Sequence, residues 1–222
     1  MKIAICYSGN LRTFSHCVKN HAEIIKEADV YISTWDTIRF SDKYNDPWHI
    51  RITIPAPKII TESYILNNTP SNFTIKNIKI DNEKNCVIKN IKQHQYLSYQ
   101  YFKIWDAYQL IINSHNNYDY IIRLRPDITI DSMVYVPNKI VFNEYTWYNY
   151  TYNTAKTINE MIWVSDMDRM QKSVNIYDNL TILDSKLDKE QIFGESICFA
   201  NLEHENLLQD LYIHNFNYRV IR

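Results

Sequence analysis

Glycine is scarce in this chain of 222 residues, which contains only Gly9 and Gly194. Glycine adopts positive φ angles without strain and lets another backbone or a ligand approach closely. A chain that otherwise avoids glycine is expected to keep it where such a conformation or approach is needed. The abundance of Asn, Ile, Lys and Tyr beside so little glycine also fits an AT-rich coding genome, such as that of a large DNA virus or a low-GC bacterium.

Cysteines and apolar residues occur without the patterns that mark secretion, zinc binding or membrane insertion. The four cysteines form no CxxC pair and have no histidine at zinc-binding spacing. No run approaches the roughly 18 apolar residues of a membrane-spanning helix, and the apolar core of residues 1–9 is too short for a signal peptide. We therefore expect a reduced, cytoplasmic protein with no transmembrane segment.

Neither sign of charge dominates, because 24 Lys and Arg residues stand against 25 Asp and Glu residues, with a net charge of −1. Without a basic excess, binding to nucleic acid through phosphate neutralisation is not expected. Because 45% of the residues are hydrophobic, the chain can form one sizeable core, and we expect a single domain over residues 1–222. Residues 217–222 start a strand and stop abruptly, which leaves open that further residues follow.

Alternating apolar segments predict an α/β fold with a mostly parallel central sheet flanked by helices. Residues 2–7 and 29–35 are predicted to be buried strands on either side of a helix at residues 14–26. Such a unit gives two parallel strands through a right-handed crossover. Apolar residues at helical spacing also predict a long helix at residues 93–113. Further strands are predicted at 58–62, 134–142 and 160–164, helices at 166–180 and 191–214, and weak structure at 64–89.

Residues 118–130 (YDYIIRLRPDITI) predict a buried strand that carries charged side chains to its carboxyl end. Arg123 and Arg125 are two residues apart and are expected on one face of the strand, and Asp127 follows Pro126. Two guanidinium groups suit a diphosphate, with Asp127 left for a divalent metal or a sugar hydroxyl. The alternative is a structural network in which Asp127 is the counter-ion of an arginine. We expect the ligand-binding role, in which replacement of Asp127 leaves the fold standing.

The ends of the first two predicted strands carry residues of a similar kind, and ligands bind at the carboxyl ends of parallel strands. Ser8 and Gly9 begin a turn in which the backbone can approach a ligand, and Arg12 can reach a phosphate. The alternative is an ordinary tight turn, and because the turn is no GxGxxG fingerprint, a dinucleotide is disfavoured. Trp35 can cover a nucleobase and Asp36 can hold a ribose, although a core tryptophan and a helix N-cap are the commoner roles.

Three further candidates come from the helices and from a late strand. Lys103 can add a phosphate contact, although a lysine in such a helix more often lies on a solvated face. Glu160 lies at the start of a predicted strand, and Glu195 follows the second glycine at a predicted helix start. Each glutamate can be a catalytic base or bind acceptor hydroxyls, although glutamates at helix starts are also common because of the helix dipole.

The order and spacing of five segments resemble glycosyltransferases of the GT-A type over about residues 2–215. The segments are SGNLRTF, DVYISTWD, YDYIIRLRPD, INEMIWVSDMDRM and FGESICFANLEHENLL. The most similar kind carries an RxRxD signature in place of the usual DxD and occurs in surface-polysaccharide gene clusters and giant DNA viruses. The resemblance implies a Rossmann-like GT-A fold and a nucleotide-diphosphate sugar donor, most often linked through UDP. It also implies a glycan or other hydroxyl acceptor, and Gly9 and Arg12 match the donor-binding loop.

The resemblance further implies roles for the carboxylates. Asp127 matches the last carboxylate of the DxD motif, which holds the donor and a divalent metal such as Mn²⁺ or Mg²⁺. Arg125 stands where the first Asp would be, and this departure puts a strong metal dependence in doubt. Glu160 stands where relatives often have Asp, and Glu195 matches the glutamate on the acceptor side. A catalytically inactive module that binds nucleotide sugars is the alternative function.

Overall fold

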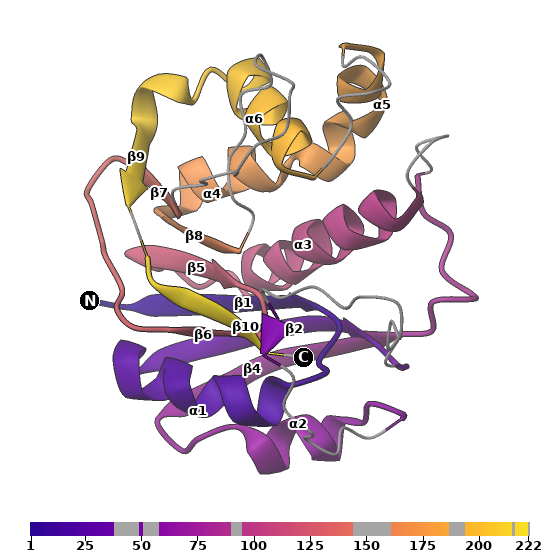
Figure 1. The fold of residues 1–222 in the computed structure, drawn as a ribbon, viewed down its shortest axis with the longest axis vertical. Coiled ribbons are helices and arrows are strands. Elements are labelled where there is room, and N and C mark those ends of the chain that lie inside the picture. Colours follow the sequence, from indigo (N-terminus) through magenta and orange to yellow (C-terminus); the bar gives the residue numbers. More distant parts are fainter. Residues whose placement is uncertain are drawn as a thin grey trace.

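The chain folds into a central β-sheet with helices on both faces (Figure 1). α1 (Phe14–Ile25) and α2 (Glu62–Asn68) cover one face. The opposite face carries α3 (Gln95–Asn113), α4 (Met167–Val174), α5 (Ile176–Lys186) and α6 (Gly194–His204). The computed structural model describes residues 1–37, 49–50, 58–89, 95–143, 161–186, 194–214 and 216–221.

The central sheet has seven strands within the described ranges, in the order β4-β2-β1-β5-β8-β7-β9. The strands β4, β2, β1 and β5 are parallel neighbours, and β9 is parallel to β7. Among the seven, β8 alone runs antiparallel to its neighbours β5 and β7. The predicted α/β fold with a mostly parallel sheet is therefore confirmed. The strand bounds are Ile3–Gly9 (β1), Ala28–Trp35 (β2), Phe73–Asp81 (β4), Tyr120–Leu124 (β5), Ile140–Asn143 (β7), Ile162–Ser165 (β8) and Leu211–His214 (β9).

The opening β1-α1-β2 unit agrees with the prediction. The two strands pair in parallel from Ala4 opposite Asp29 to Gly9 opposite Thr34. Because β1 is covered on both faces, all its residues except the last are buried, which explains its continuous apolar run. Alternate residues of β1 therefore belong to two separate apolar clusters, one under α3 and one over α1. The same alternation in β5 decides which face Arg123 occupies.

A buried histidine of α1, His21, contacts both β1 and Ile128. The hydroxyl of Tyr7 lies 2.8 Å from Nδ1 of His21, and Nε2 of His21 lies 2.9 Å from the carbonyl oxygen of Ile128. Because a carbonyl only accepts, Nε2 donates to Ile128 and Nδ1 accepts from Tyr7. Burial lowers the pKa of His21 to about 4, so the ring is neutral at pH 7. These bonds fix the backbone of the residue that directly follows Asp127.

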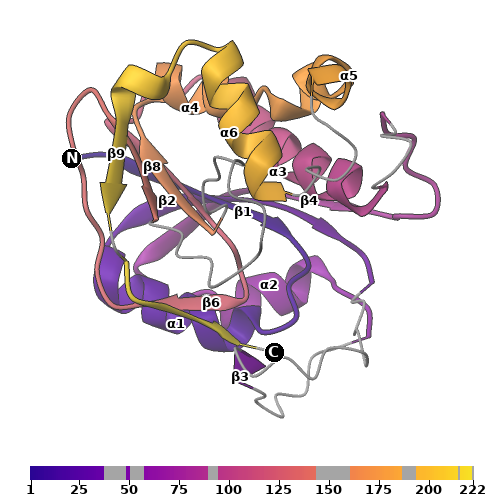
Figure 2. The ribbon, with the colours of Figure 1, turned by 45° about the horizontal axis from the view of Figure 1, so that its top comes forward.

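The predicted strand at residues 118–130 is divided between the two sheets. β5 ends at Leu124, and the chain resumes as β6 (Ile128–Ile130). Pro126 lies in the interruption because proline cannot donate to a ladder. β6 joins a smaller three-stranded sheet in the order β3-β10-β6, in which β6 and β10 lie side by side (Figure 2). The other strands of this sheet are β3 (His49–Ile50) and β10 (Tyr218–Ile221).

The prediction of weak structure at residues 64–89 is wrong. This segment contains most of α2 and the nine-residue strand β4, which pairs with β2 along its length. The apolar residues of β4 change phase between Ile75 and Ile78, so the sequence lacks a regular alternation of period two. The pairing with β2 shows an irregularity between Val30 and Tyr31, at the same level. Because of this bulge, both isoleucines pack on the same cluster over α1.

Three shorter predictions also need correction. The segment 58–62 forms only an isolated bridge between Thr37 and Ile59 before α2 begins. Of the strand predicted at residues 134–142, only the end belongs to a strand, β7. The helix predicted within residues 191–214 is shorter, because α6 ends at His204 and β9 begins at Leu211. The long helix α3 and the strand β8 lie where they were predicted. In the part of the chain that is described, no helix has both the length and the apolar character needed to cross a membrane.

Candidate functional site

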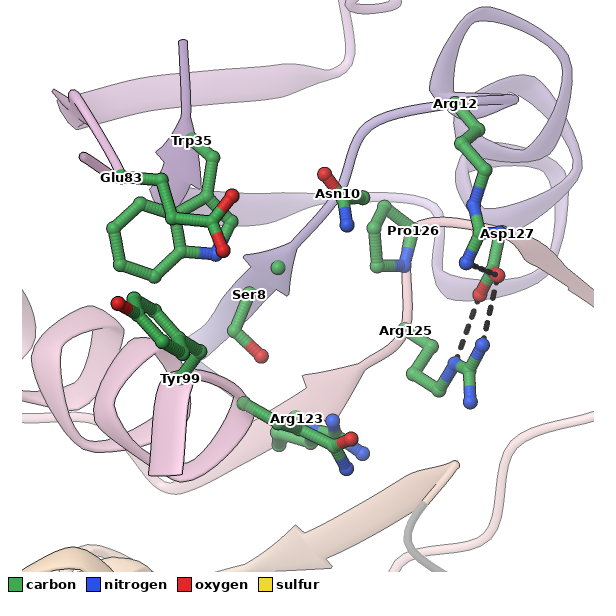
Figure 3. A pocket seen from close by; sticks show the side chains of 12 residues that line it. Ser8, Asn10, Arg12, Trp35, Glu83, Tyr99, Arg123, Arg125, Pro126 and Asp127 are labelled. Atoms are coloured by element: carbon green, nitrogen blue, oxygen red, sulfur yellow. Dashed lines mark hydrogen bonds and ion pairs between the residues drawn. The ribbon is translucent and has the colours of Figure 1, made fainter. Parts of the chain in front are cut away.

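The carboxyl ends of β1, β2 and β5 open onto one pocket with a volume of about 420 Å³ (Figure 3). Parallel strands bring their carboxyl ends to the same edge of a sheet, so the convergence expected from the sequence is present. Seven residues predicted from the sequence line the pocket, namely Ser8, Gly9, Arg12, Trp35, Arg123, Arg125 and Asp127. The other described lining residues are Asn10, Glu83, Tyr99, Gln100 and Pro126.

The end of β1 and the residue that follows it line the pocket. Gly9 has a φ of +95°, and the hydroxyl of Thr34 donates to its carbonyl oxygen at 2.7 Å. Oγ of Ser8 and Oδ1 of Asn10 are buried and have no hydrogen-bond partner within the described ranges. Buried polar atoms in that state are uncommon in native proteins. In this pocket they offer a donor and an acceptor to a polar ligand.

Replacing Gly9 with alanine is expected to lower the free energy of unfolding by about 1 kcal/mol. The cause is backbone strain at φ +95°, since a Cβ at this position would meet no atom within 4 Å. Denaturant unfolding monitored by circular dichroism measures the change. Gly194→Ala is the control, because Gly194 lies at the helical start of α6, where alanine is tolerated. Equal losses in the two variants would contradict a specific need for glycine in the loop.

Asp127 holds two arginines together at one end of the pocket (Figure 3). Arg125 donates from Nε to Oδ1 of Asp127 at 2.9 Å and from Nη2 to Oδ2 at 2.8 Å, which is a bidentate pair. Arg12 donates from Nη2 to the same Oδ2 at 3.3 Å. The side chain of Asp127 is 2% exposed, whereas those of Arg12 and Arg125 are 18% and 17% exposed. The Arg–Asp network that the sequence left as an alternative is thus present, and its members also line the pocket.

The charges in this group influence each other. Burial lowers the pKa of Arg12, Asp127 raises it, and the like charge of Arg125 lowers it. The ordinary pKa of a guanidinium is so high that Arg12 stays protonated at neutral pH. Among the described residues, Asp127 is thus paired with two guanidinium groups, those of Arg12 and Arg125.

Arg123 reaches the pocket from a different direction. Its guanidinium carbon lies 5.2 Å from the centre of the Trp163 ring, on the face of the sheet that α3 covers, and the residue is 2% exposed. Figure 3 shows Arg123 approaching from β5 on the same side of the pocket as Ser8, while Arg125 turns toward Asp127. The two arginines thus line the same pocket, although Arg125 stands one residue beyond the end of β5.

The opposite end of the pocket is aromatic and acidic (Figure 3). The rings of Trp35 and Tyr99 meet edge to face with centroids 5.5 Å apart, and Phe102 stacks on the other part of Trp35 at 6.1 Å. Trp35 is only 4% exposed, so it belongs to the core and to the pocket wall at once. Glu83 lies beside Trp35 and follows the end of β4 by two residues. The sequence analysis missed Glu83 because no strand was expected to end there.

Lys103 lies behind the aromatic wall and not on a solvated face. Its side chain is completely buried, and Nζ lies 2.5 Å from Oδ2 of Asp81 and 3.1 Å from Oγ of Ser33. Nζ also sits 4.2 Å from the centre of the Trp35 ring, a cation–π distance. Burial lowers the pKa of Lys103, while Asp81 and Asp106 raise it. The position of Lys103 outside the described lining gives no support to a phosphate contact.

The remaining candidates are not brought to the pocket within the described ranges. The carboxylate of Asp36 accepts from Nδ2 of Asn82 at 2.7 Å, and Asp36 is not part of the described lining. Glu160 lies outside the described residues. The backbone of Glu195 is in the first turn of α6, but its side chain lies outside the described part of the chain. The roles predicted for the two glutamates stay predictions.

The described residues do not fit a divalent metal held by Asp127. Manganese and magnesium are bound by several oxygen ligands, commonly from more than one carboxylate. Both oxygens of Asp127 already accept from guanidinium groups, and the other carboxylate of the described lining, Glu83, lies at the aromatic end (Figure 3). The described ranges contain no group of three or more His, Cys, Asp or Glu suited to a metal ion.

The chain matches no protein-family model and no curated protein sequence. No relative therefore supplies a function for the pocket.

Proposed function

We propose that this protein binds a nucleotide-diphosphate sugar and transfers the sugar to a hydroxyl group of a glycan or other acceptor. The observation that supports this function is one pocket with an aromatic wall at one end and paired arginines at the other. A nucleobase stacks on aromatic rings, and guanidinium groups bind phosphate oxygens in a bidentate manner. The glycine loop between the two ends suits a ribose and diphosphate that pass close to the backbone.

The size of the pocket is consistent with this ligand. Its volume of about 420 Å³ lies within the range of roughly 300–1,000 Å³ typical of small-molecule sites. Trp35 and Tyr99 would face the base, and Glu83 beside them can accept hydrogen bonds from the base edge or from ribose hydroxyls. The resemblance to GT-A glycosyltransferases makes UDP the expected nucleotide.

The proposed reaction breaks the bond between the anomeric carbon and the terminal phosphate oxygen. The acceptor oxygen forms the new bond to that carbon and loses its proton to a base. Negative charge develops on the departing diphosphate, and the guanidinium groups of Arg12, Arg123 and Arg125, which line the pocket, would stabilise it. The base is assigned to Glu195 or Glu160 by the sequence resemblance alone.

A binding module without catalysis is the second candidate function. It is favoured by the pairing of both carboxylate oxygens of Asp127 with the guanidinium of Arg125, because the resemblance would give this carboxylate a metal to hold. The two candidates differ in turnover and not in affinity. A binding module would raise the melting temperature with a donor and release no nucleoside diphosphate, whereas a transferase would also hydrolyse the donor slowly in the absence of an acceptor.

A thermal-shift panel of nucleotide sugars tests the proposed function. A ligand at a hundredfold excess over its Kd stabilises the folded state by about 2.7 kcal/mol. At least one nucleotide sugar, with UDP sugars the first choice, is expected to give such a shift. NAD is the comparison ligand, because the loop after β1 is no dinucleotide fingerprint. Calorimetry in which NAD binds more tightly than every nucleotide sugar would overturn the proposal.

Arg125→Lys is expected to weaken binding of the donor by about 1.5 kcal/mol, or roughly tenfold. Lysine keeps the charge but cannot reproduce the planar fork on a phosphate. The matched control is Arg169→Lys, because Arg169 likewise donates to carboxylates, those of Asp166 and Asp210, but lies outside the pocket lining. Calorimetric titration of both variants measures the difference. Donor affinity unchanged in a folded Arg125→Lys variant would show that Arg125 is not on the diphosphate.

A further inference from the structure

The carboxylate that would be expected to hold a metal is already engaged by arginines. Arg125 takes both oxygens of Asp127, and Arg12 shares one of them. We propose that this site neutralises a diphosphate with guanidinium groups in place of a divalent metal, and that Asp127 is a positioning residue that orients Arg12 and Arg125. The inference rests on the proposed function for the nucleotide part of the ligand, but it concerns the diphosphate alone.

The charge of the pocket supports binding of an anion without a metal. Three arginines and two carboxylates are found among the described lining residues, and one of the carboxylates is at the far end beside Trp35. Among the described lining residues, the arginine end therefore has more guanidinium groups than carboxylates. Because these guanidinium groups are partly buried, solvent and salt screen their attraction to an anion less than they screen that of a surface arginine.

In the described part of the chain, buried polar donors without a partner are found at Arg12 itself and at Ser8, which lies on the side of Arg123 (Figure 3). Nε of Arg12 is buried without a hydrogen-bond partner within the described ranges, as is Oγ of Ser8. A buried guanidinium donor in that state marks the place where an acceptor is missing. A phosphate oxygen is an acceptor that suits both groups, because Arg and Ser both donate to phosphate.

A dication at Asp127 would meet strong opposition. It would have to displace a guanidinium from a carboxylate that is 2% exposed, and it would then lie next to two fixed positive charges. The backbone around Asp127 is also fixed, because its carbonyl oxygen accepts from the amide of Ile221 at 2.7 Å and the next residue is bonded to His21. The carboxylate therefore cannot turn easily toward another partner and serves to align the arginines.

Calorimetric titration of wild-type protein with inorganic pyrophosphate, UDP and a UDP sugar tests this assignment. Each probe is titrated in buffer with EDTA and in buffer with MnCl₂, and affinities are corrected for metal bound by the probe in solution. The Kd values in the two buffers are expected to agree within about twofold. A gain of tenfold or more with manganese would overturn the inference while leaving the proposed function intact. If pyrophosphate binds in EDTA but no nucleotide does, the arginine site is supported and the proposed function is rejected. If no probe binds in either buffer, the arginine site and the proposed function are both rejected.

Asp127→Asn separates a positioning role from a metal-binding role. Loss of the negative charge strengthens attraction to every anion, while loss of the fixed orientation weakens only the anion that the arginines match in shape. The ratio of pyrophosphate to sulfate affinity is therefore expected to fall about tenfold, with no dependence on manganese in either protein. A ratio equal to that of wild type would contradict the positioning role. If the variant does not fold, the wild-type comparison between EDTA and manganese still tests the inference, because it needs no variant.

Discussion

Replacing Asp127 with alanine is expected to lower the free energy of unfolding by about 3 kcal/mol, the lower end of the roughly 3–5 kcal/mol measured for broken buried ion pairs. The carboxylate is 2% exposed, and its removal leaves Arg12 and Arg125 side by side without their shared counter-ion. The lower end applies because both arginines border the pocket and regain some hydration there. For a chain of this size, the melting temperature should fall by roughly 6–12 °C in the absence of ligand.

A matched control for Asp127 exists on the surface. Asp210 accepts from Nε of Arg169 at 2.9 Å but is 22% exposed, so Asp210→Ala should change stability by less than about 1 kcal/mol. Added pyrophosphate should restore more stability to Asp127→Ala than to wild type, because an anion replaces the missing charge between the arginines. If Asp127→Ala and Asp210→Ala lower the free energy of unfolding by similar amounts, the ion pairs of Asp127 contribute no more to stability than a more exposed pair does. The sequence led us to expect that the fold tolerates replacement of Asp127, because a residue beyond the end of a strand is often not packed. Asp127 is buried, so the reason for that expectation does not hold.

The sequence predicts this pocket well where strands are fully buried. β1, β2 and β5 are mostly apolar and mostly buried, so the pattern of residues places their carboxyl ends, with Gly9, Trp35 and Arg123, at one sheet edge. The pairing of Arg125 with Asp127 could not be decided in the same way. It depends on side-chain directions beyond the last residue of β5, where Pro126 interrupts the ladder and the alternation of faces no longer applies.

The part of the pocket that could not be predicted from the sequence lies at the end of the edge strand β4. β4 is rich in polar residues because it lies at the edge of the sheet, and its bulge shifts the phase of its apolar residues. Without β4, neither Glu83 nor the partner of Lys103 could be located. Lys103 stands near the apolar stripe of α3. Its burial could not be predicted because the carboxylate that pairs with it, Asp81, is the last residue of β4, which was not predicted.

Lys103→Met is expected to lower the free energy of unfolding by about 3–5 kcal/mol. Methionine has a similar length, so the change removes the charge with little change in packing volume. Nζ of Lys103 lies 2.5 Å from Asp81 and 3.9 Å from Asp106, and no part of the lysine side chain is exposed. Its loss leaves Asp81 with only the more distant Nζ of Lys79, at 3.7 Å, among the described residues. Denaturant unfolding of the variant measures the loss, and Lys79→Met, at a side chain that is 40% exposed, should cost about 1 kcal/mol or less.

The same variant tests whether this network supports the aromatic wall. Because Lys103 lies under the ring of Trp35, its replacement removes a cation–π contact worth up to about 2 kcal/mol in a desolvated place and frees the indole to shift. Binding of the nucleotide should then weaken, whereas binding of pyrophosphate, at the arginine end, should not. The double variant Lys103→Met with Asp81→Asn should recover part of the lost stability, because no unpaired charge is left behind. Equal losses of nucleotide and pyrophosphate affinity would indicate a general disturbance of the fold and not a specific support of Trp35.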